Sequence, residues 1–563
     1  MANRESALLQ ALDQAKHSYG SDCATECERV LKRANVRFTN AEGLIRAHDS
    51  LLFLRAFPPS AKVARLADSL LARFIPQIEQ FAAADPTRFD DESVSGMAGT
   101  TITNTWTFEL AKFLVRRHGS QVTAEVDVDN TYRQMATVLP QLLPLLDDDS
   151  YVEADTPFAK WLEAAAGSVP KVAQFLIDSF RRLPITPLLR TNLYDSLGIS
   201  LRWQLGNSRA SRTLARRPVA KLFVHNEPLM QRKQVSLQDE LTSPSLPLKK
   251  LNRHEAQSII DMSRDALAVR YRELQGSTNA DPNHAFQADG GRGVQLFIWG
   301  LAAEWRLPLR AYYAGFTLKN GVPINYFEAI GLFEWMEIGF NTFYAFREGE
   351  TAWIYSKVLH LLNQLAGITC FSVYPYQIGK DNEEAIQSGA FWFYRKLGFR
   401  PGRSDLLSLT LREERKMQRD PKHRTSPGTL RKLAEGHMLF EVGGQPLGAW
   451  DSFSTRKIGL AVQRKMVSEF GGDPIKMRRR TSAKLARMLG VDFSRWQPGE
   501  QQAFSNFALA LSVCHEFKSW SDADKKALVG ILRSKAGPNE TRYLRLLQKH
   551  EKLRAAFLLA GST

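Results

Sequence analysis

Cysteine is scarce in this sequence: only Cys23, Cys27, Cys370 and Cys514 occur among 563 residues. A disulfide framework is excluded at that density, which favours a reducing compartment. Cys23 and Cys27 are spaced to share one helix face, with His17 nearby, but a closed zinc site needs four ligands. Two ordinary buried or half-buried cysteines are the simpler interpretation, so no metal site is predicted.

Long apolar runs are also missing. No window approaches about 18 uncharged apolar residues, and even the run from Phe108 to Val115 is interrupted by Glu109 and Lys112. The amino terminus, Met-Ala-Asn-Arg-Glu-Ser, includes an acidic residue and lacks the apolar stretch of a signal peptide. These absences predict a protein without a transmembrane segment that works in the cytoplasm.

Two well-known catalytic motifs do not occur. The glycines within residues 95–100 come without the lysine and the spacing of a phosphate-binding P-loop. No Gly-x-Ser-x-Gly is present, which excludes the strained nucleophile turn of the α/β-hydrolases. Any chemistry must therefore come from another group of residues.

The net charge of +16 is concentrated at one end of the chain. Residues 401–563 hold 30 Lys and Arg against 16 Asp and Glu, whereas residues 1–400 hold 45 against 43. This asymmetry predicts an anionic partner for residues 401–563, with tRNA or DNA first and a phospholipid surface second. Solubility alone is the competing explanation. We expect a basic face centred on Lys476, Arg478, Arg479, Arg480, Lys484 and Arg487.

The hydrophobic pattern predicts an α+β protein with helical ends. Residues 1–215 repeat apolar residues at three- and four-residue spacing, which predicts an all-helical domain. Prolines punctuate a linker at 216–250, and residues 251–411 begin with a helix before strand-like alternation starts near Gly293. Residues 412–563 are predicted to form a basic helical domain, although the stretch 402–450 is expected to be partly irregular.

The region between 293 and 411 is predicted to be a sheet with two helices. Strands are expected at 294–299, 309–318, 323–333, 337–346 and 369–374, and helices at 351–365 and 382–396. Asn320-Gly321 predicts a tight hairpin, because this pair supplies the positive φ angles of a type I′ turn. We expect a mixed, mainly antiparallel sheet of about five to seven strands, splayed open where 337–346 meets 369–374.

The last helix and strand of this region carry a family resemblance. Asn382, Ala385, Ile386, Tyr394 and the Lys-Leu-Gly-Phe run at 396–399 resemble the pattern that closes a GNAT N-acyltransferase domain. Together with the preceding order of strands and helices, the resemblance covers about 285–401. More narrowly, the segment 375–392 is similar to a group of large bacterial proteins. The resemblance implies a GNAT-like domain that uses acyl-CoA as a co-substrate and holds no tightly bound cofactor.

The loop before the helix at 351–365 is where a GNAT domain would hold the CoA pyrophosphate. A helix N-terminus suits this role, because its unpaired N–H groups and positive dipole end attract phosphate. Glu350 stands at the usual glycine position, so CoA binding requires that Glu348 and Glu350 point to solvent. The resemblance assigns donor binding to Thr342, Ala345, Arg347, Gly349, Thr351, Ala352 and Asn382.

Acyl transfer to an amine needs a base for the amine proton and often an acid for the leaving thiolate. Glu337 begins the strand that normally lines the acceptor site, which makes it the candidate base. Tyr394 stands where the family places a thiolate-facing tyrosine. Backbone N–H groups of residues 342–345 would polarise the thioester carbonyl, and the amine would enter across the strands bearing Glu328 and Glu337.

These features predict an N-acyltransferase that moves an acyl group from acyl-CoA, or a similar activated donor, to an unidentified amine. Two alternatives remain open. An inactive GNAT-like domain would serve as a binding or adaptor module, with the basic C-terminal helices on nucleic acid. An aminoacyl-tRNA-dependent transferase would use residues 401–563 for tRNA and would not need an intact CoA loop.

Overall fold

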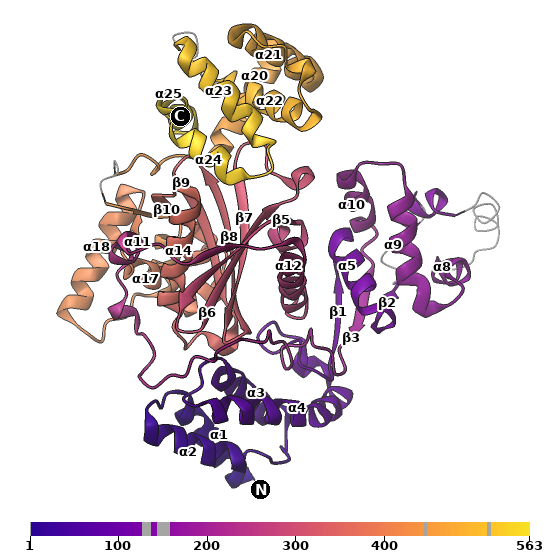
Figure 1. The fold of residues 1–563 in the computed structure, drawn as a ribbon, viewed down its shortest axis with the longest axis vertical. Coiled ribbons are helices and arrows are strands. Elements are labelled where there is room, and N and C mark those ends of the chain that lie inside the picture. Colours follow the sequence, from indigo (N-terminus) through magenta and orange to yellow (C-terminus); the bar gives the residue numbers. More distant parts are fainter. Residues whose placement is uncertain are drawn as a thin grey trace.

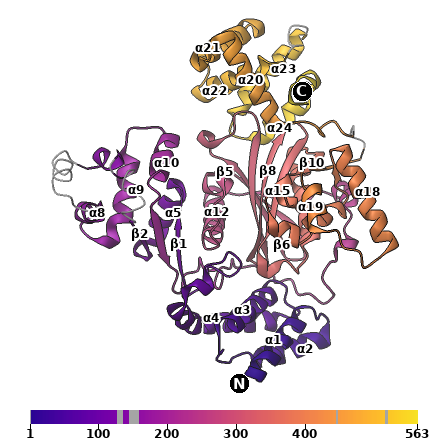
Figure 2. The same cartoon turned by 180° about the vertical axis from the view of Figure 1, so that it is seen from behind.

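The protein is built around one large sheet, with three groups of elements set around it. The computed structural model describes residues 2–126, 135, 137–143, 158–443, 447–514 and 520–562. In Figure 1 the N-terminal helices lie below the sheet, the C-terminal helices lie above it, and a small α/β unit lies at its side. Figure 2 shows the same arrangement from behind. The two ends of the chain therefore lie at opposite ends of the molecule.

Within the described residues the large sheet has nine strands, in the order β11-β12-β10-β9-β8-β7-β6-β5-β4. Neighbouring strands are antiparallel except β9 and β10, which run parallel. A parallel pair needs a crossover connection, and α14 (Thr351–Ala366) supplies it. The strands are β4 (Leu248–Lys250), β5 (Ala280–Gly291), β6 (Val294–Leu301), β7 (Ala311–Lys319), β8 (Val322–Leu332), β9 (Trp335–Thr342), β10 (Cys370–Val373), β11 (Arg400–Pro401) and β12 (Met438–Glu441).

The turn between β7 and β8 is the two-residue hairpin that the sequence predicts. Lys319 pairs with Val322, and the intervening Asn320 and Gly321 have φ angles of 51° and 78°. Positive φ at both positions is what a type I′ turn requires. A Cβ atom at Gly321 would lie 1.9 Å from the carbonyl oxygen of Arg217, so close approach of the linker adds a second reason for glycine.

The sheet is larger than the sequence predicts. The strands β6 to β11 fall between 293 and 411, and β4, β5 and β12 are additional. β12 inserts between β10 and β11, so the prediction of an all-helical 412–563 is wrong. Residues 402–450, expected to be partly irregular, contain α18 (Ser404–Arg419) and α19 (Pro427–Leu433) besides β12, with irregular segments between them. α18 buries only Leu406, Thr410 and Glu413, which leaves almost no apolar stripe to detect.

The prediction that residues 1–215 are all helical is wrong as well. β1 (Thr101–Thr105), β2 (Val122–Glu125) and β3 (Ser200–Gln204) form an antiparallel sheet in the order β1-β3-β2. Only Leu201 and Trp203 are buried in β3, and so short an alternation does not stand out from the helical pattern around it. The helices α5 (Phe108–His118), α8 (Phe158–Ala166), α9 (Val172–Arg182) and α10 (Pro187–Asp195) share with this sheet a second hydrophobic core.

The remaining helices belong to the main core. The N-terminal group is α1 (Ala2–Lys16), α2 (Ser21–Arg33), α3 (Ala41–Ala56) and α4 (Ala61–Ala84), whose buried residues continue into those of the sheet. The stretch 216–250, predicted to be a linker, contains α11 (Leu237–Thr242) and the edge strand β4, and α12 (Arg253–Ala268) and α13 (Gln275–Thr278) follow it. The C-terminal group is α20 (Thr455–Phe470), α21 (Pro474–Leu489), α22 (Pro498–Leu511), α23 (Asp522–Lys535), α24 (Glu540–Gln548) and α25 (Glu551–Ser562).

The helix predicted at 382–396 is divided in two. It consists of α16 (Glu383–Gln387) and α17 (Ala390–Arg395), and Gly389 between them has a left-handed φ of 66°. An α-helix does not continue through a residue in that conformation, so the chain bends between the two segments. The bend follows α15 (Pro375–Ile378), and the three short helices together form one side of the site described below.

Candidate functional site

The main candidate site is a cavity of about 380 Å³ where β9 and β10 separate. Parallel pairing runs from Cys370 opposite Trp335 to Ser372 opposite Glu337 and then stops. Beyond that point the chain after β10 turns into α15, whereas β9 continues to Thr342. Of the residues that the sequence assigned to a site, Thr342, Arg347, Thr351, Asn382 and Tyr394 line this cavity.

The free edge of β9 forms one wall of the cavity. The Phe340 N–H donates to the Gln377 side-chain oxygen at 3.3 Å, so it points away from β8 and toward the opening. Alternate residues of an antiparallel strand direct their N–H groups to the same side, so Thr342 also presents its N–H there. Two main-chain donors of β9 therefore face the cavity.

α14 begins at the same cavity with Thr351. Its N-cap residue, Glu350, makes no side-chain capping hydrogen bond. The first N–H groups of a helix have no partners within the helix, and the helix dipole adds positive potential at this end. The start of α14 is therefore a place where a phosphate group can bind.

Glu350 itself is turned away from the cavity. It is fully buried, and its carboxylate lies 2.5 Å from Arg292 and 3.2 Å from Lys319 and accepts the Met230 N–H at 3.1 Å. Burial raises the pKa of Glu350, but Lys319 and Arg292 outweigh that effect and hold it below its usual value. The expectation that Glu350 points to solvent is wrong, because both cations lie on the inner side of the loop.

Glu348 and Gly349 face the N-terminal helices. Glu348 keeps 56% of its side chain exposed and lies 3.0 Å from Lys16 of α1. A Cβ atom at Gly349 would lie 2.6 Å from the Phe57 ring, so glycine allows the loop to approach the end of α3 closely. Neither Glu348 nor Glu350 lines the cavity, so these two glutamates do not face a phosphate bound there.

Some of the residues assigned to donor binding in this loop line the cavity, and others do not. Arg347 and Thr351 reach the cavity, whereas Ala345, Gly349 and Ala352 do not line it. The Thr351 hydroxyl donates to the Arg347 carbonyl oxygen at 3.3 Å, and this contact ties the two together at the mouth of the cavity.

A salt bridge joins this loop to α16 across the cavity. Arg347 Nη1 lies 2.5 Å from Glu384 Oε1, and the guanidinium group lies 3.7 Å from the centre of the Tyr344 ring. The two charged side chains are 36% and 44% exposed, so solvent screens their attraction. A phosphate group can replace Glu384 as the partner of Arg347 at little cost.

Tyr394 and Asn382 line the side of the cavity formed by the short helices. The Tyr394 hydroxyl donates to the Gln377 side-chain oxygen at 3.3 Å, and burial raises its pKa, so the phenol stays protonated. Asn382 is the N-cap of α16, where its side-chain oxygen accepts the Ala385 N–H at 3.1 Å. Tyr394 therefore offers a proton at the cavity, whereas Asn382 fixes the start of α16.

Glu328 of β8, on one of the two strands across which the sequence predicts that the amine enters, lines the cavity. It lies opposite Gly339 of β9, and it accepts hydrogen bonds from the Tyr312 hydroxyl and from the Gly276 N–H at 3.4 Å. Burial raises the pKa of this carboxyl group. The sequence places a single acidic residue in an apolar strand here, but only the cross-strand register reveals which wall it occupies.

Glu337, the base that the sequence favours, does not line this cavity. It sits at the last position of β9 that pairs with β10, where its carboxylate lies 3.9 Å from His437 Nδ1. Burial raises the pKa of Glu337, while Arg310 and Arg456 act in the opposite direction. Of the two carboxylates that the sequence associates with the acceptor amine, Glu328 therefore lines the cavity and Glu337 lies outside it.

Comparisons of the chain with family models, with curated proteins and with solved structures find no match. Within the described residues there is no group of three or more His, Cys, Asp or Glu placed to hold a metal ion. No helix in the described part of the chain is both long and apolar enough to cross a membrane.

Proposed function

We propose that the protein is an N-acyltransferase whose donor, an acyl-CoA thioester, binds in the cavity between β9 and β10. One observation carries this proposal: two parallel strands part beside the start of α14, which brings main-chain donors and a helix N-terminus to one cavity. The resemblance of residues 285–401 to a GNAT domain supports it, as does the crossover of β9 to β10 through α14.

The donor is proposed to lie along the free edge of β9. Its pyrophosphate would bind the N–H groups at the start of α14 and the guanidinium group of Arg347, once Arg347 is released from Glu384. The amide carbonyl groups of the pantetheine arm would pair with the N–H group of Thr342 and, once it is released from Gln377, with that of Phe340, as an added strand pairs with a sheet edge.

Glu328 and Tyr394 are proposed to handle the protons. Glu328 would take a proton from the ammonium group of the acceptor, and the free amine would attack the thioester carbonyl carbon. The C–N bond forms and the C–S bond breaks, and the leaving thiolate takes the hydroxyl proton of Tyr394. The nitrogen that attacked still carries one extra proton, which passes to the Tyr394 phenolate, and Glu328 returns its proton to solvent, so the products are an amide and free CoA.

Isothermal titration of acetyl-CoA and of longer acyl-CoAs tests the donor site. Thr351→Pro removes one N–H donor at a first-turn position that proline tolerates, so the fold should persist while affinity falls by about tenfold. Thr455→Pro, at the first position of α20, is the matched control and should leave the affinity unchanged. No heat with any acyl-CoA would overturn the proposal.

A second candidate function, nucleic-acid binding, is favoured by the surface of α21. Lys476, Arg480, Lys484 and Arg487 follow one another at four-, four- and three-residue spacing on one helix face. None of the four forms an ion pair with a carboxylate in the described part of the chain. Like charges at this spacing destabilise a helix, so a phosphate backbone would relieve a repulsion that is already present.

Fluorescence anisotropy with tRNA and with duplex DNA at several salt concentrations tests this second function. Replacing the four α21 residues by glutamine should weaken binding and reduce the slope of log K against log salt by about three to four. The matched control replaces Arg412, Arg415 and Arg419, which are exposed on α18. Equal losses in both variants, or no binding at low salt, would leave solubility as the explanation of the charge.

A further inference from the structure

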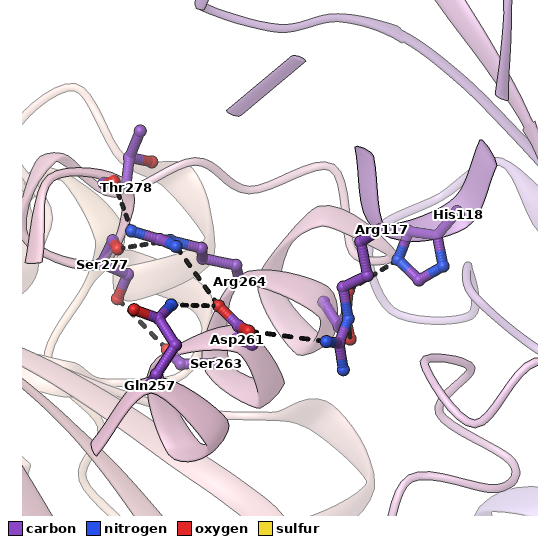
Figure 3. A network of polar contacts seen from close by, with 9 residues as sticks. Arg117, His118, Gln257, Asp261, Ser263, Arg264, Ser277 and Thr278 are labelled. Carbon is purple, nitrogen blue, oxygen red and sulfur yellow. Dashed lines mark hydrogen bonds and ion pairs between the residues drawn. The ribbon is translucent and has the colours of Figure 1, made fainter. Parts of the chain in front are cut away.

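A second recess has a volume of about 470 Å³. Three segments surround it: the end of α5, residues 208–218 after β3, and α12. Arg117 and His118 reach it from α5, and Asp265 reaches it from α12. Figure 3 shows Arg117 and His118 beside each other, directed toward the helix that carries Asp261 and Arg264. The three walls come from different parts of the chain, and none of them belongs to the cavity between β9 and β10.

Positive charge exceeds negative charge in this recess. Among the described residues, four arginines line it, Arg117, Arg209, Arg216 and Arg217, against one carboxylate, that of Asp265. Asp265 is already shared, since its two oxygens lie 2.9 Å from Arg117 Nε and 2.9 Å from His118 Nε2. Like charges held together repel, so this arrangement favours an anionic ligand.

Two of the arginines form no ion pair with a carboxylate among the described residues, although Arg217 lies near enough to Glu255 to help lower the pKa of that carboxyl group. Arg209 is exposed and forms no ion pair with a carboxylate in the described part of the chain. The Arg217 guanidinium group lies 5.5 Å from the centre of the Phe297 ring, and its Nη1 atom is buried without a hydrogen-bond partner among the described residues. Arg216, by contrast, pairs with Asp68 of α4.

The walls of the recess are held in place before any ligand arrives. The Arg217 N–H donates to the Gly321 carbonyl oxygen at 2.8 Å, which fixes the linker to the β7–β8 hairpin. Asp261, 3.5 Å from Arg117, is itself held by Gln257 at 2.6 Å and Arg264 at 3.3 Å, as the dashed lines in Figure 3 show. A preformed site loses less conformational entropy on binding.

We propose that this recess binds a nucleoside polyphosphate. Its volume lies within the range of about 300–1,000 Å³ that small-molecule sites occupy. Arg209 and Arg217 would contact the phosphate groups, because guanidinium groups pair with phosphate through two parallel hydrogen bonds. Met262 of α12 is partly exposed, lines the recess and gives the nucleoside an apolar surface, with the buried Ile259 beside it. The proposal is independent of acyl transfer.

Isothermal titration of the full-length protein with ATP and, separately, with pyrophosphate tests this site. ATP should bind, and Arg209→Gln combined with Arg217→Gln should weaken it by at least about tenfold. Arg209→Gln alone should also weaken binding, and because Arg209 is exposed this variant keeps its fold. Arg412→Gln, an exposed arginine of α18, and Thr351→Pro should each leave ATP affinity unchanged.

Three outcomes would overturn the assignment. The first is an absence of ATP binding in the low millimolar range. The second is a loss of affinity in Thr351→Pro as large as that in the arginine variants, which would place the phosphate at α14. The third is an equal affinity for pyrophosphate and ATP, since the apolar wall would then contribute nothing.

Discussion

Replacing Glu328 by glutamine lowers the rate of acyl transfer by about 10²–10⁴-fold, the contribution of a positioned general base. Glutamine keeps the shape of the side chain and still accepts a hydrogen bond from Tyr312, so the cavity is preserved. Acyl-CoA affinity should stay within about twofold of the wild-type value, because Glu328 is not assigned to the donor. Steady-state release of CoA, measured with saturating amine, gives the result.

The matched control is Glu337→Gln, which removes the other carboxylate of this region from a position outside the cavity. It should leave the rate nearly unchanged. A large loss in Glu337→Gln with none in Glu328→Gln would return the role of base to Glu337.

The pH dependence gives a second readout for the same residue. Burial raises the pKa of Glu328, so the ionised base is lost as pH falls through a range above that of an exposed carboxylate. In the wild-type protein kcat/KM should therefore decline on the acid side, and this limb should be absent in Glu328→Gln. An unchanged acid limb in the variant would contradict the assignment.

Glu350→Gln should lower the free energy of unfolding by about 3–5 kcal/mol, because it leaves buried cations without their counter-ion. Lys319 is fully buried, and burial already lowers its pKa to about 8. Without the Glu350 carboxylate, Lys319 and Arg292 would face each other across the same space. Urea unfolding followed by circular dichroism measures the change.

Glu348→Gln is the control for this prediction, since Glu348 is half exposed and its pair with Lys16 is worth about 0–1 kcal/mol. The pH dependence has a definite sign. The pKa of Glu350 is depressed in the folded protein, so its contribution is present at neutral pH and is lost as pH falls through the depressed value. Glu350→Gln should lack that loss. Equal stability of the two variants would show that the ion pairs of Glu350 with Lys319 and Arg292 do not stabilise the fold by this amount.

Local signals in the sequence were enough to predict the centre of the sheet. Asn320-Gly321 predicts the hairpin between β7 and β8, because few residue pairs other than Asn-Gly readily adopt two successive positive φ angles. The pattern of α14 and its stop at Gly367 were equally clear, since Gly367 takes the left-handed C-terminal position. Thr351, which opens that helix, and Arg347 were assigned to the site and do line the cavity.

The remaining features depend on contacts between distant residues. Glu350 was expected in solvent, but Lys319 and Arg292, far away in sequence, pair with it inside the protein. The cavity position of Glu328 depends on its pairing with Gly339 across the sheet, which a single strand does not encode. β1 and β3 were missed for a similar reason, because strands this short are stabilised by their partners more than by their own pattern.

Amide hydrogen exchange with and without acetyl-CoA is the decisive test of whether acyl-CoA binds between β9 and β10. The N–H groups of Phe340 and Thr342 on the free edge of β9 and the first N–H groups of α14, at Thr351 and Ala352, should exchange more slowly when the donor is bound. Thr351→Pro should lose this protection together with affinity. Protection confined to α21 or to the arginine recess, or no protection at any amide, would contradict the claim.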